Sequence, residues 1–496
     1  MSSRQEISQH PGSDRFLRWT ILLGCSFFFL EFIAYSFVDI DLWHQVALIR
    51  DSLAAGHLLR SDPYAYTPTL PWVDHEWGAG ALAFFTTQWF GPGAIIALKI
   101  LAALGTLFAC LRCSQMRGAH LSLSGGCALL GTFLLYLGFF PAVRAQAYSF
   151  FFAAVWLCLL ELDRRGSRVW IIAALLLLPV WLNLHAGFAV AFVFTALYAV
   201  EVAVQGRAVW HLPALLCAMT LEIFANPYGS AYFAYLRRGL WMARPYSAEW
   251  SPLATLGMPW IAAFAAALLI AAASILAIGW SKAPGLLILT ATALEATVHR
   301  KLLPLFAVAW LCYVPAFLQA TPVGRFAIDF SQRKARFLSS AWILLACLCA
   351  YGAARQQPWE LRVLQPIYPI GAVEYFTRQQ FVGNVMVPFR LGAYVSYKLY
   401  PRVKVSVDSR YEVAYPDAVV KQMSDFYAAR PDWLATLNAY PTDAVLVPAD
   451  EPIARWMPAS AWNRVYSDRQ FQIYVRPGIA LPAEDGSARS FSDVFP

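Results

Sequence analysis

Long apolar stretches without charged side chains are the feature that most constrains the fold of this chain. They recur up to about residue 354 and run for roughly 15 to 25 residues, the length that a helix needs to cross a hydrocarbon core about 30 Å thick. Only 14% of the residues are charged, against about 25% in an ordinary soluble domain, so water is not the main solvent. A membrane β-barrel would show weak period-two segments instead. The sequence therefore predicts a polytopic α-helical membrane protein.

We expect about eleven transmembrane helices. Their approximate ranges are 16–38, 79–111, 122–140, 147–162, 169–182, 186–204, 210–224, 259–279, 285–298, 302–318 and 337–354. The first follows Arg15 and Arg18, is too long for a signal peptide and lacks a small-residue cleavage site, so it is predicted to stay uncleaved. Gly91-Pro92-Gly93 interrupts the second, so residues 79–90 are expected to lie along the interface or to re-enter.

The basic residues predict the orientation of the chain. The formal net charge is +8, but the lysines and arginines lie in short clusters between apolar stretches, as the positive-inside tendency requires, and this argues against nucleic acid as a partner. Placing Arg15 and Arg18 inside makes most of the inside loops basic. We therefore predict a multi-pass protein of the bacterial cytoplasmic (inner) membrane, with a cytoplasmic N-terminus and an extracytoplasmic C-terminal domain.

The last part of the chain has the composition of a water-soluble α/β domain. We predict a transmembrane domain over 1–354, with its first extracytoplasmic loop at 39–78, a linker over 355–370 and a soluble domain over 371–496. Strands are expected at 384–388, 403–407 and 443–447, helices at 391–400 and 416–429, and a terminal hairpin of 464–466 with 471–475. The nine cysteines all lie within or beside spans, so this domain needs no disulfide framework.

On this topology the conspicuous polar residues gather on the extracytoplasmic side of the membrane. The first outside loop carries two acidic groups of residues, and the later outside segments carry most of the cations. The residues are Asp39, Asp41, His44, Asp74, His75 and Glu76 in the first loop, and Arg144, His185, Arg244, His299, Arg300 and Lys301 in the later segments. A carboxylate can remove a proton from an acceptor hydroxyl, and arginine, lysine or histidine can hold a phosphate leaving group. Both functions are required for glycosyl transfer from a lipid phosphate.

An acidic motif directly after the first span is followed by a helix, by Gly56 and by a polar aromatic stretch, Trp72–Trp77. In this order the sequence resembles the GT-C class of polyprenyl-phosphate-sugar-dependent glycosyltransferases, of the family 39-like kind, which includes protein mannosyltransferases, aminoarabinose transferases and oligosaccharyltransferases. The resemblance implies a GT-C-like arrangement of the helices, a donor carried on a polyprenyl phosphate and a catalytic base at Asp41 or Asp39. Protein mannosyltransferases commonly have adjacent Asp-Glu where this chain has Asp-Ile-Asp-Leu, so both aspartates remain candidates.

Further short motifs resemble a less characterised bacterial branch with a soluble C-terminal domain. They are Trp181–His185 (W-x-N-x-H), Asn226–Gly229 (N-P-Y-G), Glu249–Pro252 (E-W-x-P) and Val405–Arg410 (V-x-x-D-x-R). The match covers nearly the whole chain. The Trp-Trp-Asp motif by which oligosaccharyltransferases recognise their acceptor is absent from the C-terminal domain, which argues against asparagine glycosylation.

Each candidate residue also has a structural interpretation. Asp39 and Asp41 are suited to capping a helix, His185 to a tight helical hairpin, and Asn226–Gly229 to a turn. Asp74, His75 and Glu76 suit acceptor binding, a divalent metal such as Mg²⁺ or Mn²⁺, or simply a solvated loop, and the sequence identifies no cofactor with certainty. Asp408 and Arg410 are candidates on the acceptor side, but such a pair is often a structural latch.

The sequence as a whole favours an inverting membrane glycosyltransferase with an aspartate as general base. It would move a sugar from a polyprenyl-phosphate-linked donor to an extracytoplasmic glycan, lipid or protein acceptor. Three other functions remain open: a transporter or lipid flippase, a catalytically inactive membrane assembly protein, and an O-antigen polymerase or ligase. Transporters favour internal repeats and broken helices near the midplane, and the sequence contains neither.

Overall fold

The computed structural model describes residues 11–140, 142–242 and 248–495. Its contacts divide the chain into two compact units. The first, which we call the helical unit, comprises Met1–Ser36, Ile96–Ala225 and Ala243–Trp359. The second, which we call the mixed unit, comprises Phe37–Ile95, Asn226–Met242 and Glu360–Pro496. The loop that follows the first apolar helix therefore folds with the C-terminal part of the chain.

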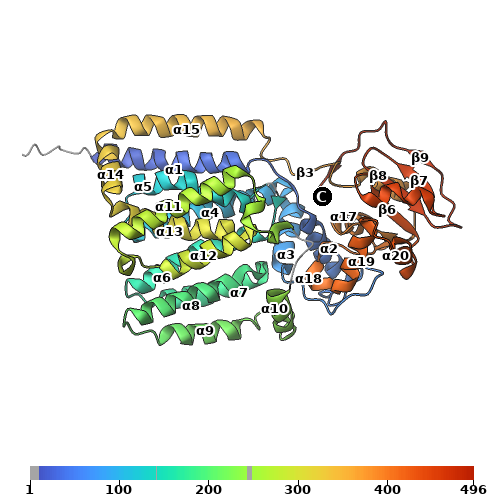
Figure 1. Ribbon diagram of the computed structural model, residues 1–496, viewed down its shortest axis with the longest axis horizontal. Helices are drawn as coiled ribbons and strands as arrows, with labels where there is room; N and C mark the ends of the chain where they lie inside the picture. Colours follow the sequence, from blue (N-terminus) through green and yellow to red (C-terminus); the bar gives the residue numbers. More distant parts are fainter. Residues whose placement is uncertain (1–10, 141, 243–247, 496) are drawn as a thin grey trace, which may run out of the picture. The chain divides into compact units, whose positions relative to one another are not determined.

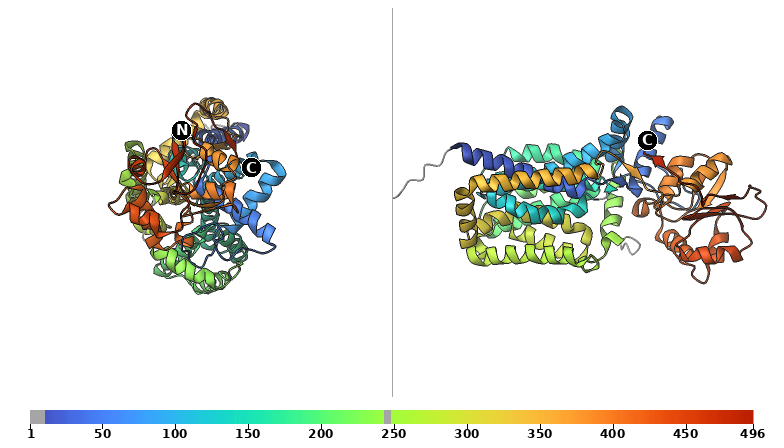
Figure 2. Two further views of the ribbon diagram at one scale, coloured as in Figure 1. Left: turned by 90° about the vertical axis from the view of Figure 1, so that its right-hand side faces the viewer. Right: turned by 90° about the horizontal axis from the view of Figure 1, so that it is seen from above.

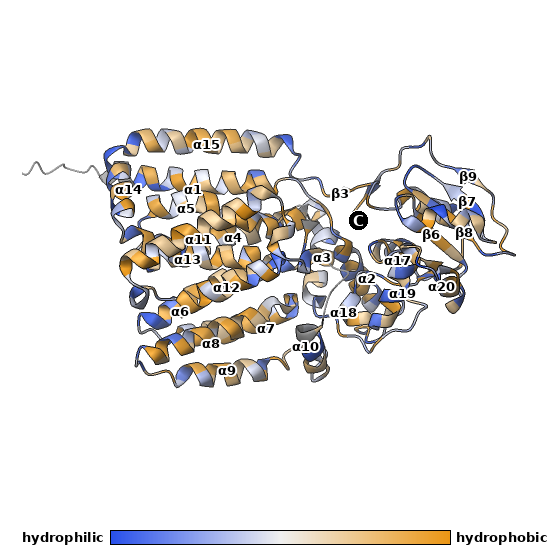
Figure 3. Ribbon diagram, viewed as in Figure 1, coloured by the Kyte–Doolittle hydropathy of each residue, from blue (hydrophilic) through white to orange (hydrophobic). Residues whose placement is uncertain are grey.

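The helical unit is a bundle of apolar helices (Figures 1 and 3). Its helices are α1 Pro11–Ile33, α4 Gly93–Met116, α5 Leu121–Leu135, α6 Gln146–Arg164, α7 Trp170–Leu184, α8 Ala189–Val204, α9 His211–Glu222, α11 Met258–Ile278, α12 Leu286–Val298, α13 Leu303–Gln319, α14 Pro322–Arg333 and α15 Ala335–Arg355. Among the described residues, eight helices are long and apolar enough to cross a membrane, and α7 and α12 are shorter apolar helices. The predicted polytopic helical fold is confirmed.

Burial differs strongly among these helices. The stretch that contains α13 is 78% buried, whereas α15 is only 17% buried, so α13 is the central helix and α15 presents most of its surface outward. α1 packs along α15 (Figure 1), where a Cβ atom on Gly24 would lie 2.3 Å from the Trp342 ring. Only glycine permits this close approach. The stretch predicted as a span at 210–224 contains α9, which at 12 residues is shorter than a bilayer crossing requires.

One helix of the bundle has a different direction. α14 crosses the ends of the other helices at the end where α1 begins (Figures 1 and 2). Thr321 caps its N-terminus by accepting a hydrogen bond from the Gly324 amide at 3.1 Å, and Pro322 follows at the first helical position. Lys334 separates α14 from α15, so the chain turns there into its last long helix.

The mixed unit contains a six-stranded sheet with the order β5-β4-β6-β8-β7-β9. The strands are β4 Gly383–Met386, β5 Val403–Val405, β6 Ala444–Pro448, β7 Asn463–Ser467, β8 Phe471–Val475 and β9 Glu484–Asp485. β4 pairs in parallel with β5 and β6, whereas β8 is antiparallel to β6 and β7. The predicted strands and the terminal hairpin are confirmed, and so are the two predicted helices, as α17 Gly392–Leu399 and α19 Asp417–Tyr427.

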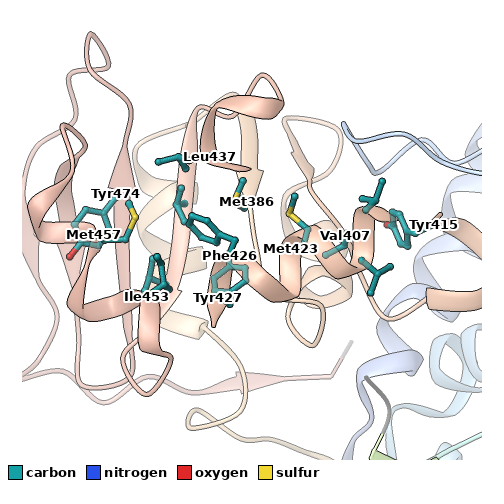
Figure 4. Close-up of a cluster of buried hydrophobic side chains, with 14 of the residues drawn as sticks. Met386, Val407, Tyr415, Met423, Phe426, Tyr427, Leu437, Ile453, Met457 and Tyr474 are labelled. Carbon is teal, nitrogen blue, oxygen red and sulfur yellow. The ribbon is translucent and has the colours of Figure 1, made fainter. Parts of the chain in front are cut away.

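Buried apolar side chains pack between the sheet and its helices. Met386, Phe426, Ile453 and Tyr474 belong to this core and are drawn in Figure 4. α16 Ile370–Arg378, α18 Tyr411–Ala414 and α20 Trp433–Ala439 complete the C-terminal part of the unit. The core needs no disulfide, since no cysteine follows Cys349 in the sequence.

The first loop is built into this unit by backbone hydrogen bonds. The Tyr66 amide donates to the Val405 carbonyl at 3.0 Å, and the Val405 amide donates to the Tyr64 carbonyl at 2.9 Å. Residues 64–66 thus extend the sheet beyond β5. β1 Phe37–Val38 pairs in parallel with β3 Arg362–Val363, and β10 Asp493–Val494 pairs with β3 in the antiparallel sense. The loop also contributes α2 Ile40–Ala55 and α3 Trp77–Phe90, and the 226–242 segment contributes α10 Ala231–Trp241.

Candidate functional site

The first acidic motif forms the N-terminus of α2. Asp39 is the N-cap residue, and its carboxylate accepts a hydrogen bond from the Asp41 amide at 3.0 Å. Asp41 lies in the first helical turn, where the helix dipole favours a negative charge. Asp39 is only 3% exposed, whereas Asp41 is half-buried. Gly56 caps the C-terminus of α2, and its φ of 72° lies in the left-handed region that glycine adopts readily.

His44 lies one turn after Asp41 and meets the C-terminal part of the chain. Its Nδ1 is 3.1 Å from the Ser409 hydroxyl, which donates to the Ile40 carbonyl at 3.4 Å. Because that hydroxyl donates to Ile40, Nδ1 is the donor to Ser409, and Nε2 is left as the acceptor. Burial lowers the pKa of His44 to about 4, although the negative charge of Asp408 opposes this. The imidazole is therefore neutral at neutral pH.

The second loop motif packs directly against α2. Glu76 precedes α3 and accepts a hydrogen bond from the Gln45 side chain. α3 approaches α2 so closely that a Cβ atom on Gly80 would lie 2.7 Å from the Gln45 carbonyl oxygen. The ring of His75 stacks on Tyr235 of α10, with centroids 4.9 Å apart and an interplanar angle of 20°. The two acidic motifs of the first loop therefore lie next to each other.

Asp74 is a buried carboxyl group in the same cluster. It accepts a hydrogen bond from the Glu76 amide at 2.9 Å, but burial outweighs this bond and raises the pKa of Asp74 to about 6. The N-P-Y-G stretch forms a turn in which the Asn226 side chain accepts from the Tyr228 amide at 2.7 Å and Gly229 has a φ of 56°. Burial, and then the charge of Asp74, raise the pKa of Tyr228, so its phenol stays protonated.

Asp408 and Arg410 form a buried ion pair with a third partner in the first loop. Arg410 donates to Asp408 through Nε at 2.9 Å and through Nη2 at 2.5 Å, and Nη2 also donates to Asp62 at 3.0 Å. Its guanidinium lies 5.2 Å from the centroid of the Tyr64 ring and 5.4 Å from that of the Trp72 ring. Burial would raise the pKa of Asp408, but the Arg410 charge holds it below its usual range. The buried ion pair therefore connects the first loop to the C-terminal part of the mixed unit.

A cluster of cations occupies one end of the helical unit. Glu249 accepts from Arg144, and its other carboxylate oxygen lies 3.9 Å from Nζ of Lys301. The Lys301 ammonium also lies 4.3 Å from the centroid of the Trp250 ring. Exposed fractions of 32% for the Arg144 side chain, 35% for Glu249 and 23% for Lys301 leave all three accessible to solvent. Two residues of the E-W-x-P motif, Glu249 and Trp250, thus contact Lys301.

The neighbouring His299 and Arg300 complete this cluster. Nδ1 of His299 is 3.0 Å from the Trp250 carbonyl oxygen, and the Arg300 amide donates to the Ser251 carbonyl at 2.9 Å. The segment at 299–301 is therefore held to the segment at 249–251 by hydrogen bonds to two backbone carbonyls as well as by charge. With Arg144, Arg300 and Lys301 against Glu249, the cluster has a net positive charge.

His185 lies at the end of α7 in a separate polar group. Its Nδ1 accepts from the Gly187 amide at 2.8 Å and lies 2.8 Å from the Ser149 hydroxyl, to which Trp181 donates at 2.8 Å. Because Nδ1 accepts, Nε2 holds the proton in the neutral ring. Asn183 of the same motif donates to the Ala225 carbonyl at 2.8 Å. The W-x-N-x-H residues thus organise the helix ends at this position.

Two sequence predictions remain, the role of Arg244 and the divalent metal. Arg244 lies outside the described residues. In the described part of the chain, no three His, Cys, Asp or Glu side chains are grouped so that they could hold a metal ion. Sequence reasoning missed Gln45, Asp62 and Tyr235, because each owes its place in the cluster to a contact between distant segments.

Comparison with known proteins supports the fold. No protein-family model matches the sequence, and no characterised protein matches it by sequence. Among solved structures, the chain is similar to ArnT from Cupriavidus metallidurans in the apo state, with a TM-score of 0.51 and 12% sequence identity. The similarity covers 90% of this chain and 95% of the ArnT chain. The expected GT-C-like fold is therefore confirmed over nearly the whole length.

Proposed function

We propose that this chain is a membrane glycosyltransferase that transfers a sugar from a polyprenyl-phosphate-linked donor to an extracytoplasmic acceptor with inversion. The observation that carries the proposal is a GT-C-like fold in which the first apolar helix is followed by a capped helix with an aspartate in its first turn. The proposal includes insertion in the bacterial inner membrane, with the N-terminus in the cytoplasm and the mixed unit outside.

In the proposed reaction Asp41 is the general base. Its carboxylate takes the proton from an acceptor hydroxyl while that oxygen attacks the anomeric carbon, and the bond from this carbon to the donor phosphate breaks. Asp39 is the weaker candidate, because its carboxylate caps α2 and is almost completely buried. The proton on Nδ1 of His44 is directed toward Ser409, so His44 supports the first turn of α2 as a neutral group.

The cation cluster is the proposed binding group for the donor phosphate. Arg144 and Lys301 share Glu249, so a phosphate can replace a carboxylate as their partner without leaving either cation unpaired. Positive charge at this position stabilises the phosphate oxygens as the glycosidic bond breaks. Arg300 and His299 are assigned to the same role. We assign His185, whose Nδ1 accepts from the Gly187 amide at 2.8 Å, to substrate binding as well.

The second loop motif is the proposed acceptor-side group. Asp74, with a pKa of about 6, offers a carboxyl that can donate or accept a hydrogen bond near neutral pH, and His75 is held by its stack on Tyr235. Asp408 and Arg410 are assigned as positioning residues, because both are buried and Arg410 pairs with Asp408 and with Asp62. No step is assigned to a metal ion.

The test is glycosyl transfer in membranes containing the full chain, with a radiolabelled polyprenyl-phosphate sugar as donor and release of polyprenyl phosphate as the readout. Asp41→Asn is expected to lower the rate by about 100-fold or more, as removal of a general base does. Asp417→Asn is the matched control, since Asp417 is an exposed aspartate in the first turn of α19. Full activity in both Asp39→Asn and Asp41→Asn would remove the proposed base.

A further inference from the structure

Two adjoining clefts lie at the end of the helical unit that α14 crosses. One, of about 420 Å³, which we call the polar cleft, has Arg18, Gln115, His120 and Gln319 in its wall beside Gly118, Ala119, Leu121 and Ile328. The other, of about 400 Å³, is lined by apolar groups that include Leu17, Gly126, Trp310 and Trp342. Each is within the size range of small-molecule sites, about 300 to 1,000 Å³. One end of the bundle thus has two clefts of similar volume, one with a mixed polar and apolar wall and one with a mainly apolar wall.

The two clefts share their walls. Leu17 and Arg18 of α1 line different clefts although they are consecutive residues, and the same holds for Ala327 and Ile328 of α14. On α13 the pair is Leu318 and Gln319. A ligand with a polar head and an apolar tail can therefore occupy both clefts at once.

The charges around the polar cleft favour an anionic head group. Arg18 is exposed and makes no ion pair with any residue that the structure describes. On and beside α14 the exposed basic residues are Arg325, Arg333, Lys334 and Arg336, and the only exposed acidic residue is Asp329. A negative head group placed at Arg18 would lie in a cleft bordered by α14, whose exposed charges are mostly positive.

The position of α14 fits a membrane surface. Val323 is 68% exposed and Phe326 is 71% exposed, and these residues recur with Phe330 on one face of a helix that crosses the bundle ends (Figures 1 and 2). Helices with an apolar face beside basic residues lie in the interface between head groups and acyl chains. The polar cleft next to α14 is therefore at the depth of lipid head groups.

We propose that the two clefts bind one anionic glycerophospholipid of the leaflet that α14 faces, with its phosphate at Arg18 and an acyl chain against Trp310 and Trp342. This site is separate from the proposed donor phosphate site. α6 runs from the residues beside Arg144 to Arg164 at the opposite end, a length of about 28 Å at 1.5 Å per residue. The proposal does not depend on the transferase activity.

Two substitutions test the head-group contact and the acyl-chain contact separately. Arg18→Gln removes the charge at the polar cleft. Gly126→Leu fills the apolar cleft, because a Cβ atom on this helical glycine meets no described atom within 4 Å, so the new side chain extends into open space. Arg112→Gln is the matched control, since Arg112 is an exposed arginine on α4 that lines neither cleft.

The experiment is native mass spectrometry of the full chain in detergent, titrated with phosphatidylglycerol or with phosphatidylcholine of the same acyl chains. The wild type is expected to bind phosphatidylglycerol about tenfold more tightly than phosphatidylcholine. Arg18→Gln is expected to remove most of this preference. Gly126→Leu should weaken the binding of both lipids, and Arg112→Gln should weaken neither.

Three results would overturn the lipid site. Equal binding of the two lipids by the wild type would exclude recognition of the charge. An equal loss in Arg112→Gln and Arg18→Gln would show attraction by the whole basic surface. Displacement of phosphatidylglycerol by millimolar inorganic phosphate would show an anion site without a role for the acyl chain.

Discussion

The carboxylate of Asp62 accepts a hydrogen bond from Nη2 of Arg410 at 3.0 Å, although the two residues are 348 positions apart in the chain. Both side chains are at most 1% exposed. Asp408 pairs with the same guanidinium, so two buried carboxylates share one cation. Besides the backbone bonds of Tyr64 and Tyr66 to Val405, the first loop and the C-terminal part of the mixed unit are thus joined by a buried ion cluster centred on one arginine.

This arrangement predicts an order of stability among variants. Arg410→Gln leaves two carboxylates buried without a counter-charge and is expected to lower the free energy of unfolding by about 3 to 5 kcal/mol. Asp62→Asn leaves the neutral Asp408–Arg410 pair and is expected to cost only about 1 to 2 kcal/mol. Apparent melting temperatures of the full chain in detergent measure both changes.

The exposed pair of Lys421 with Asp425 on α19 is the control for this comparison. Lys421→Ala should cost less than about 1 kcal/mol, since exposed ion pairs contribute little. If Asp62→Asn were more destabilising than Arg410→Gln, the guanidinium would not be the group that holds the two carboxylates in place.

His44 and Asp74 predict opposite pH dependences. The pKa of His44 is lowered to about 4, so between about pH 6.5 and 4 the unfolded chain binds the extra proton and acid destabilises the fold. The pKa of Asp74 is raised to about 6, so between about pH 6 and 4 the folded chain binds the extra proton and acid stabilises the fold. The two contributions largely cancel in the wild type.

Single variants should expose each contribution. As the pH falls from 6 to 4, the free energy of unfolding of His44→Gln is expected to rise relative to that of the wild type, because only the Asp74 contribution remains. Asp74→Asn is expected to lose stability over the same range. Melting temperatures measured at a series of pH values test this, and parallel curves for the three proteins would contradict it.

Much of the fold could be predicted because its causes are local. Uncharged stretches of span length, the basic loops between them and the alternation of apolar residues after 371 are all visible in short windows. The N-cap role of Asp39 and the turn at Asn226–Gly229 are local as well, and both are present. These features need no knowledge of distant contacts.

The rest depended on contacts that no short window contains. Residues 64–66 pair with β5, and the Gln45 side chain donates to Glu76. Nothing in the sequences of these segments indicates which other segment they contact. Asp408 and Arg410 look like surface residues after a strand, yet their burial follows from Asp62 in the first loop. A buried ion pair of this kind can be recognised only once both segments are placed.

The Glu249 carboxylate predicts a difference between two variants in donor binding. Arg144→Gln removes a proposed phosphate ligand and is expected to raise the KM for the donor about tenfold, which corresponds to about 1.4 kcal/mol. Glu249→Gln keeps both cations and removes only the group that orients them, so its effect on KM should be smaller. Arg207→Gln is the control, because Arg207 is an exposed arginine that follows α8. A larger effect of Glu249→Gln would assign the carboxylate itself to the substrate.

The basic loops predict which side of the membrane each end of the helical unit faces. Gln332→Cys lies on α14 among the basic residues, and Ala488→Cys lies on an exposed part of the mixed unit. If the basic end is cytoplasmic, a membrane-impermeant maleimide should label Ala488→Cys in intact cells and Gln332→Cys only after permeabilisation. The wild type, whose Cys217 and Cys347 are exposed, gives the background labelling. The reverse pattern would place the Asp41 motif on the wrong side for an extracytoplasmic acceptor, because α2 and Ala488 belong to one compact unit, and the proposed reaction would then fail together with the topology.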